Sequence, residues 1–281
     1  MTQRKSARQS LGEMSAGAVW LDTKDPILYW KRMDRMRRGF ITSVKKQWVN
    51  DFRKENRALF AAVGDVKHPI EFRDAIIAQV VKHYDMKPSY KKTYGGIVPV
   101  FAERVYDQLT GAKRQKADPK LLDAWLAAAL DWVELQGGEL IAAVEGYSHK
   151  YVVAWVSKLT SQAIEEGWAL PQLKRAVMAQ FDGMAEFRAA RIARTEVMRA
   201  ASLGGNVAAN TTDLKLMKEW LIGIPGMGDR HAVHYPGLDG QQRELEEYYD
   251  VGGYAALYPL DAMLPASESV NCVCSEYYIP K

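Results

Sequence analysis

Cysteine is nearly absent from this chain, and long apolar runs are missing. Among its 281 residues the two cysteines are Cys272 and Cys274, two positions apart. A disulfide between them would close a small, strained ring, so it could not join distant parts of a fold. We therefore expect reduced thiols and a protein assembled in a reducing cytosol. No apolar run approaches the roughly 20 residues that a membrane helix needs, and the stretch "MTQRKSARQSLGEMSAGAVW" lacks the apolar segment of a signal peptide.

Charge is unevenly distributed along the chain. Met1 to Ala58 contains 14 Lys and Arg against 6 Asp and Glu, whereas Gly204 to Lys281 contains 5 against 11. Such asymmetry indicates two ends that face different partners, although a basic run can also be a solvated helix face. The candidate surface for DNA or an acidic partner comprises Arg37, Arg38, Lys45, Lys46, Arg53 and Lys54. Contact with double-stranded DNA there would be electrostatic and without sequence preference.

Helical patterns dominate the first three quarters of the chain. Residues 1–24 are polar and predict a flexible basic arm. Asp25-Pro26 and Asp118-Pro119 each predict a helix start, with Asp as the N-cap and Pro as the first helical residue. Apolar residues recur every four positions at Phe40, Val44, Trp48 and Phe52, which predicts a packing face. The segment "KPSYKKTYGG" at 87–96 predicts a loop.

The pattern changes near Thr212, where short apolar runs alternate with Gly and Pro. "VNCVCSEYYI" at 270–279 alternates like a half-buried strand. The fold prediction is a mainly α protein, with an elongated helical body and a small, loop-rich α+β cap at the C-terminus. Its predicted divisions are an arm at 1–24, a helical domain at 25–137, and a C-terminal domain at 138–281 that consists of long helices over 138–211 and a cap over 212–281.

A series of short motifs follows in the C-terminal half. They are "RIARTEVMRA" (191–200), Asn206, "EWLIGI" around Trp220, "GDRHAVHYPGLDG" (228–240), "YPLD" (258–261) and "NCVC" (271–274). In this order the set resembles the phage Mu F-like family of head morphogenesis proteins, also called minor head proteins. The resemblance covers residues 138–281. Val273 stands where that family has Arg, Ala262 stands where it has Pro, and one extra residue separates His234 from "LDG".

The resemblance implies a structural virion protein of a tailed phage or prophage. Such proteins associate with the portal and the capsid interior during head assembly in the host cytoplasm, and some members contact DNA. The residues that carry the motif would then have structural roles: Arg191, Arg194, Thr195, Glu196, Asn206, Trp220, Asp229, His234, Asp239, Gly240, Tyr258, Pro259, Asp261, Asn271, Cys272 and Cys274. Arg194 and Glu196 could hydrogen-bond the loops of the cap, and Asp239-Gly240 suits a tight hairpin turn.

Besides a nucleic-acid-binding module, which rests on the basic residues described above, two alternatives remain open on the residues. His231, His234, Cys272 and Cys274 could form a structural zinc site, although H-x-x-H and C-x-C are tighter than the usual spacings. The favoured prediction is that the cysteines are small buried residues and that no cofactor is bound. A phage-associated transferase or toxin-type enzyme is the other alternative. No Gly-rich phosphate loop precedes a helix, and a Cys–His dyad would need an orienting third group, so we expect no catalysis.

Overall fold

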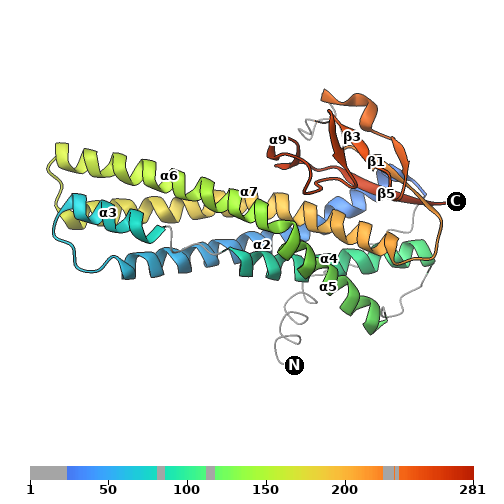
Figure 1. Ribbon diagram of the computed structural model, residues 1–281, viewed down its shortest axis with the longest axis horizontal. Helices are drawn as coiled ribbons and strands as arrows, with labels where there is room; N and C mark the ends of the chain where they lie inside the picture. Colours follow the sequence, from blue (N-terminus) through green and yellow to red (C-terminus); the bar gives the residue numbers. More distant parts are fainter. Residues whose placement is uncertain (1–23, 81–85, 112–117, 224–230, 232–233) are drawn as a thin grey trace. The chain divides into compact units, whose positions relative to one another are not determined.

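The computed structural model describes residues 24–80, 86–111, 118–223, 231 and 234–281 (Figure 1). Over these residues the protein is mainly helical with a small C-terminal sheet, which confirms the predicted fold class. The long helices are α2 (Pro26–Ala62), α3 (Pro69–Val80), α4 (Lys87–Thr110), α5 (Pro119–Leu135), α6 (Gly137–Glu165) and α7 (Leu170–Asn210). None of the helices in the described residues is long and apolar enough to cross a membrane.

Both predicted Asp-Pro helix starts are confirmed. The Asp25 carboxylate accepts hydrogen bonds from the backbone N–H groups of Ile27, at 2.9 Å, and Leu28, at 3.2 Å. Asp118 caps α5 in the same way, through the N–H of Lys120 at 2.9 Å. Each aspartate therefore satisfies N–H groups that have no partner inside the helix.

The sheet begins after α7, which confirms the change of pattern predicted near Thr212. Strand β1 (Leu216–Leu221) lies between β2 (Gln242–Glu244) and β5 (Ser275–Pro280), and both pairs are antiparallel. A separate hairpin joins β3 (Tyr249–Val251) and β4 (Tyr254–Ala256). Two short helices complete the region, the 3-10 helix η1 (Pro236–Leu238) and α9 (Ala266–Ser269).

The described residues form two compact units that interleave along the chain. Unit 1 draws on the described residues within 24–44, 90–136 and 191–281, and unit 2 on those within 45–89 and 137–190. Helices α2 and α7 contribute to both units. The units thus follow packing rather than chain order. The predicted domain boundary between 25–137 and 138–281 stays a prediction.

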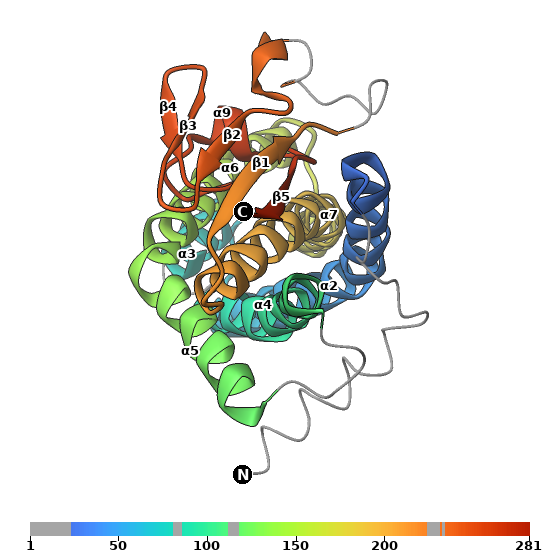
Figure 2. The same cartoon turned by 90° about the vertical axis from the view of Figure 1, so that its right-hand side faces the viewer.

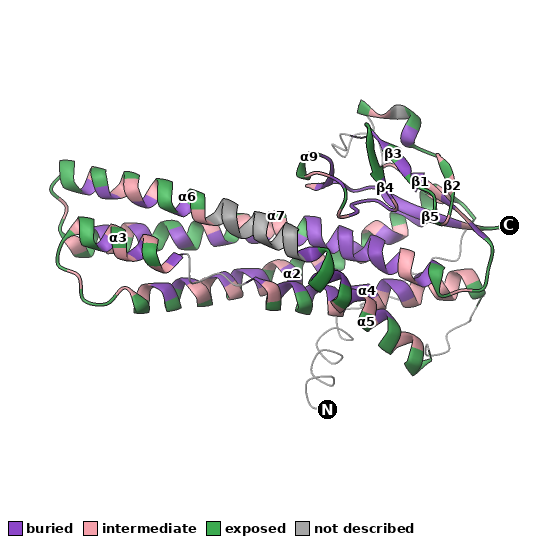
Figure 3. Cartoon of the chain, in the orientation of Figure 1, coloured by how far each residue is buried: buried purple, intermediate pink, exposed green. Residues whose placement is uncertain are grey.

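The core of unit 1 is the last part of α7. Almost every residue from Ala193 to Ala209 is buried (Figure 3), as expected for a helix enclosed on all sides. On one side Gly204 lies against α4, and on another Gly205 lies against Tyr278 of β5. The sheet and this part of the helix therefore lie next to each other (Figure 2).

Unit 2 has an aromatic core of its own. The ring of Phe181 in α7 lies edge-on to Phe60 of α2, with centroids 5.3 Å apart, and to Trp155 of α6, at 5.0 Å. Trp48 and Phe52 are also buried here, while Phe40 and Val44 are buried in unit 1. The stripe of four apolar residues on α2 is therefore a packing face, as predicted.

The close contact between α7 and α4 requires a residue without a side chain at Gly204. A Cβ added there would lie 2.7 Å from the carbonyl oxygen of Val98 and 3.0 Å from the Cβ of Phe101. We expect Gly204→Ala to destabilise the protein by roughly 1–2 kcal/mol, because overpacking exceeds the gain in helix propensity. Gly183 of α7 is the matched control, since a Cβ there meets nothing within 4 Å, and Gly183→Ala should stabilise by about 0.5–1 kcal/mol. Urea denaturation of both variants measures this; equal effects would contradict it.

Three local predictions are wrong. Residues 87–96 are not a loop but the first turns of α4, because Tyr90 and Tyr94 are fully buried there. The final strand begins at Ser275 rather than before the cysteines, because α9 and a turn occupy 266–271. Arg37 is not part of a surface, since its side chain is fully buried.

Candidate functional site

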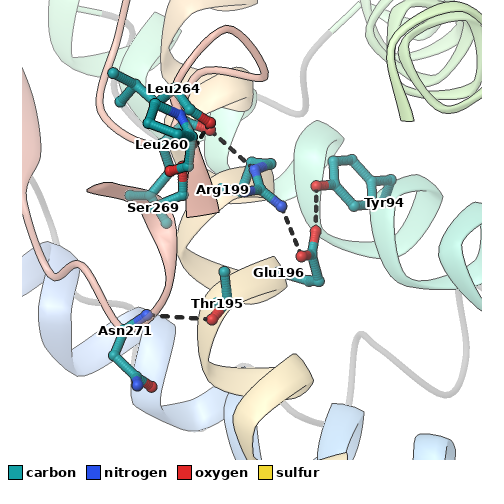
Figure 4. A network of polar contacts seen from close by, with 9 residues as sticks. Tyr94, Thr195, Glu196, Arg199, Leu260, Leu264, Ser269 and Asn271 are labelled. Atoms are coloured by element: carbon teal, nitrogen blue, oxygen red, sulfur yellow. Dashed lines mark hydrogen bonds and ion pairs between the residues drawn. The ribbon is translucent and has the colours of Figure 1, made fainter. Parts of the chain in front are cut away.

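A buried polar network, called here the α7 network, connects α7 to α4 and to the C-terminal loops (Figure 4). The Glu196 carboxylate accepts a hydrogen bond from Arg199 Nη1 at 2.6 Å and another from the Tyr94 hydroxyl at 2.7 Å. Arg199 Nε donates to the carbonyl oxygen of Leu260 at 2.9 Å. Glu196 and Arg199 are three residues apart, so they lie on the same face of the helix.

The charged groups of this network, Glu196 and Arg199, are buried. Burial opposes the charge on Arg199, but Glu196 and the hydroxyls of Tyr94 and Tyr90 outweigh it, so the pKa of the guanidinium lies above its ordinary value. Burial, together with the neighbouring Glu196, raises the pKa of Tyr94 well above its usual range. Tyr94 is therefore a neutral donor to an ionised pair, a charge-assisted arrangement that is stronger than a neutral hydrogen bond.

The loop from Leu257 to Cys272 is fixed to α7 at two points. Leu260, whose carbonyl meets Arg199, has a φ of 64°, and Asn271 has a φ of 61°. Non-glycine residues seldom adopt this backbone region, so the surrounding contacts must hold them there. For Asn271 the contact is its backbone N–H, which donates to the hydroxyl of Thr195 at 3.3 Å. Inside the loop Asp261 accepts from the N–H groups of Leu257 and Met263.

Asp239-Gly240 forms a turn at the edge of the sheet. Asp239 Oδ1 accepts from the N–H of Ile222 at 2.8 Å, and the N–H of Gly240 donates to the carbonyl of Trp220 at 2.8 Å. Gly240 has a φ of 73°, which suits glycine. Asp239 and Gly240 thus form a turn, but not the predicted tight turn of a hairpin, because a long connection separates the end of β1 at Leu221 from the start of β2 at Gln242. The turn joins the segment before β2 to the end of β1.

A second buried group, called here the Cys–His cluster, consists of His231, Cys272 and Cys274. His231 Nδ1 lies 3.1 Å from the sulfur of Cys274 and 3.6 Å from the sulfur of Cys272. His231 Nε2 lies 3.2 Å from a carboxylate oxygen of Glu268, in α9. Both cysteines are free thiols, and the three potential metal-ligand atoms lie within 4.8 Å of one another.

Helix α2 holds the backbone of the cysteine segment. Trp30 Nε1 donates to the carbonyl of Val273 at 3.1 Å. Arg37 donates from Nη1 to the carbonyl of Cys274 at 3.4 Å and from Nη2 to the hydroxyl of Ser275 at 3.1 Å. Burial lowers the pKa of Arg37, while Tyr29, Asp34 and the two cysteines oppose that shift. Arg37 therefore positions this segment instead of facing a partner.

The inner face of the sheet carries two further buried ionisable groups. Lys218 of β1 donates from Nζ to the carbonyl of Leu257 at 2.6 Å, and its ammonium lies 4.9 Å from the centre of the Tyr249 ring. Burial lowers the pKa of Lys218, against the opposing effect of Glu276. Burial raises the pKa of Glu276 to about 7, although Lys218 and the hydroxyl of Tyr278 oppose that shift.

The structure separates the residues of the predicted motif into buried and exposed sets. Trp220 is fully buried, with its ring edge-on to those of Tyr249 and His231. The other buried members are Thr195, Glu196, Tyr258, Pro259, Asp261, Cys272 and Cys274. The exposed set consists of Arg191, Arg194, His234, Asp239, Gly240 and Asn271. The expected bonds from Arg194 and Glu196 to the cap loops are replaced by others. Arg194 is exposed, and Glu196 binds Tyr94 and Arg199. Arg199, five residues after Arg194 on α7, binds the cap loop instead.

Two more residues of the predicted motif have other outcomes. Asn206 accepts hydrogen bonds from the side chain of Asn210 on α7 itself. Asp229 lies outside the described residues. In the predicted zinc set, His234 is exposed and does not belong to the Cys–His cluster.

The predicted basic surface is partly neutralised by acidic neighbours. Lys45 and Arg53 both contact the carboxylate of Glu186, at 3.3 and 3.2 Å, and Arg38 pairs with Asp34 at 2.7 Å. Lys46 and Lys54 are exposed, and no ion pair to either is found among the described residues.

Sequence reasoning missed Tyr94, Arg199, Lys218 and Glu276. A signal existed for Arg199, because it follows Glu196 by three positions on a helix and has the opposite charge. The burial of Arg37 also had a signal in the sequence. Arg37 lies four residues after Met33 and three before Phe40, which places it on the buried stripe of α2. Lys218 and Glu276 carry no such signal, since charged residues in short strands are usually exposed.

Comparison of the chain with protein-family models, with curated proteins and with solved structures gave no significant match.

Proposed function

We propose that this chain is a minor head protein of a tailed phage or prophage, which associates with the portal and the capsid interior during head assembly. The observation that carries the proposal is the ordered motif series of residues 191–274. Its members on α7 and in the C-terminal loops contact each other, as Thr195 contacts Asn271. A motif whose members stabilise one another is consistent with an assembly protein, in which a rigid surface matters more than a reactive group.

The Cys–His cluster supports the same choice over an enzyme. Cys274, His231 and Glu268 lie in the order of a nucleophile, a base and an orienting group. Cys274 and His231, however, have no exposed surface, and a nucleophile must reach its substrate. We therefore propose an internal, non-catalytic role for the cluster.

Coexpression with the portal and capsid proteins encoded beside its gene tests the proposal. We expect the tagged full-length chain to retain the portal protein through affinity and size-exclusion steps, while the tag alone does not. The neighbouring genes provide an independent check, because a portal gene and a capsid or scaffold gene should flank this one. A chain that elutes alone in the presence of its cognate portal and capsid proteins would show that the proposed function is wrong.

Contact with packaged DNA is the second part of the proposal, and it rests on Lys46 and Lys54. If they neutralise phosphates, Lys46→Gln with Lys54→Gln should reduce the slope of log affinity against log salt by about 1.8, which is about 0.9 for each phosphate that is no longer neutralised. The control is Lys45→Gln with Arg53→Gln, where Glu186 already offsets the charge, and its slope should change less. Titration of a labelled duplex across a salt series measures both slopes. Equal slopes in the wild type and the Lys46–Lys54 variant would remove DNA from the proposal.

A further inference from the structure

The Cys–His cluster has the composition of a metal site. It offers two sulfur atoms and one imidazole nitrogen, all within 4.8 Å of one another. Thiolate and imidazole ligands favour zinc and similar borderline-soft ions over magnesium or calcium, which prefer oxygen. Disulfide formation does not explain the arrangement, because the thiols are free and a Cys-x-Cys ring is strained.

The distances in the cluster are close to those of a tetrahedral zinc centre. Zinc binds sulfur at about 2.3 Å and nitrogen at about 2.0 Å, so tetrahedral angles place a sulfur and a nitrogen ligand about 3.5 Å apart. The distances from His231 Nδ1 to the two sulfurs are 3.1 and 3.6 Å. The two sulfurs lie within 4.8 Å of each other, and a tetrahedral zinc ion would hold them about 3.8 Å apart, so binding would draw them together by up to about 1 Å.

Glu268 orients the imidazole for metal binding. Its carboxylate oxygen lies 3.2 Å from His231 Nε2. In the tautomer that carries its proton on Nε2, this nitrogen donates a hydrogen bond to the carboxylate, and the lone pair of Nδ1 faces the sulfurs. A carboxylate on the far nitrogen is the usual neighbour of a histidine that binds zinc.

A backbone donor and a buried cation lie close to the cysteine sulfurs. The N–H of Cys274 points to the sulfur of Cys272 at 3.4 Å, so this sulfur is an acceptor. Asn271, directly before Cys272, is held at a φ of 61°, a local strain that clusters at functional sites. The buried guanidinium of Arg37 holds the carbonyl of Cys274 and adds a positive charge near the sulfurs.

We propose that His231 Nδ1, Cys272 Sγ and Cys274 Sγ bind one zinc ion, with Glu268 orienting the histidine. These three side chains would fill three of the four positions of the tetrahedron, and a water molecule enclosed with the ion would fill the fourth. This site replaces the predicted set that included His234, and it replaces the expectation that the cysteines only fill space. It does not depend on the proposed role in the phage head. The zinc ion would join the segment before η1 to the segment before β5, and so stabilise the C-terminal part of unit 1.

Metal analysis of the full-length chain tests the site. Protein purified without chelator, or incubated with zinc and desalted, should contain one zinc per chain. His231→Gln should lose the ion, whereas His234→Gln, which changes an exposed histidine three residues away, should keep it. A wild-type chain that remains free of zinc after incubation would overturn the proposal, as would a His231→Gln variant that keeps its full equivalent.

Two measurements on the wild-type chain cover the case in which the variants do not fold. Replacing zinc by Co²⁺ should give the visible bands of a tetrahedral ion and a near-ultraviolet sulfur-to-metal charge-transfer band. A Co²⁺ complex without the charge-transfer band would overturn the assignment of the cysteines. Adding a strong chelator should lower the thermal midpoint by roughly 10 °C, if free zinc had been about a thousandfold above its dissociation constant. An unchanged midpoint in the chelated, metal-free protein would show that no ion stabilises this region.

Discussion

Replacing Arg199 by Ala should destabilise the protein by about 3–5 kcal/mol, because Glu196 then remains as a buried charge without its cation. The pair is almost fully enclosed, with the two side chains 3% and 6% exposed. The substitution also removes the donor to the carbonyl of Leu260, so the loop at Leu257–Cys272 is then fixed to α7 at one point instead of two.

Arg194→Ala is the matched control for this prediction. It truncates the same residue type on the same helix at an exposed position, and such changes usually stay within about 0.5 kcal/mol. Urea denaturation followed by far-ultraviolet circular dichroism and by tryptophan fluorescence compares the two variants. The α7 network would not be the main support of the cap loop if Arg199→Ala cost no more than Arg194→Ala.

Glu276→Gln should become more stable than the wild type as the pH rises. The pKa of Glu276 is about 7 in the folded protein, against an ordinary value of 4.5, and burial is the main cause. Between these two values the folded state holds a proton that the unfolded state has released, so wild-type stability falls as the pH rises from about 4.5 to about 7. Glutamine resembles the protonated form and does not titrate.

The stability difference between variant and wild type should therefore grow by up to about 3 kcal/mol between pH 4.5 and pH 8, at 1.36 kcal/mol per pKa unit. Urea unfolding at several pH values in this window measures that difference. Glu219→Gln is the control, because Glu219 lies on the other face of the same sheet and binds the side chain of Gln242 near the surface. A constant difference between Glu276→Gln and the wild type would show that Glu276 titrates normally.

Local signals in the sequence predicted the helix starts and the change of structure after α7. Asp25-Pro26 and Asp118-Pro119 act through neighbouring atoms only, so they could be interpreted without knowledge of the fold. The structure of residues 87–96 could not be predicted in this way. Their glycines and tyrosines resemble a loop, but a Cβ at Gly95 would lie 3.3 Å from Leu126 of α5. The glycine thus allows a close helix–helix contact, and burial of Tyr94 favours the helix over local preference.

The site was only partly predictable for a similar reason. The sequence predicted a possible set of His231 and His234 with the two cysteines, because thiolates and imidazoles are common zinc ligands. Which histidine lies beside the cysteines depends on the path of the chain between β1 and η1. The spacing of His231 and His234 in the sequence does not distinguish between them. Glu276 and Lys218 gave no signal at all, since their burial results from packing of the sheet against α7 and the cap loops.

The most direct test of the proposed function is quantitative mass spectrometry of purified heads from the phage or induced prophage that encodes this chain. The proposal predicts that the chain is present in assembled heads at a small, reproducible ratio to the major capsid protein, and that it remains after protease treatment of the intact particle. Its absence from purified heads, while it is abundant in the same lysate, would contradict the proposal.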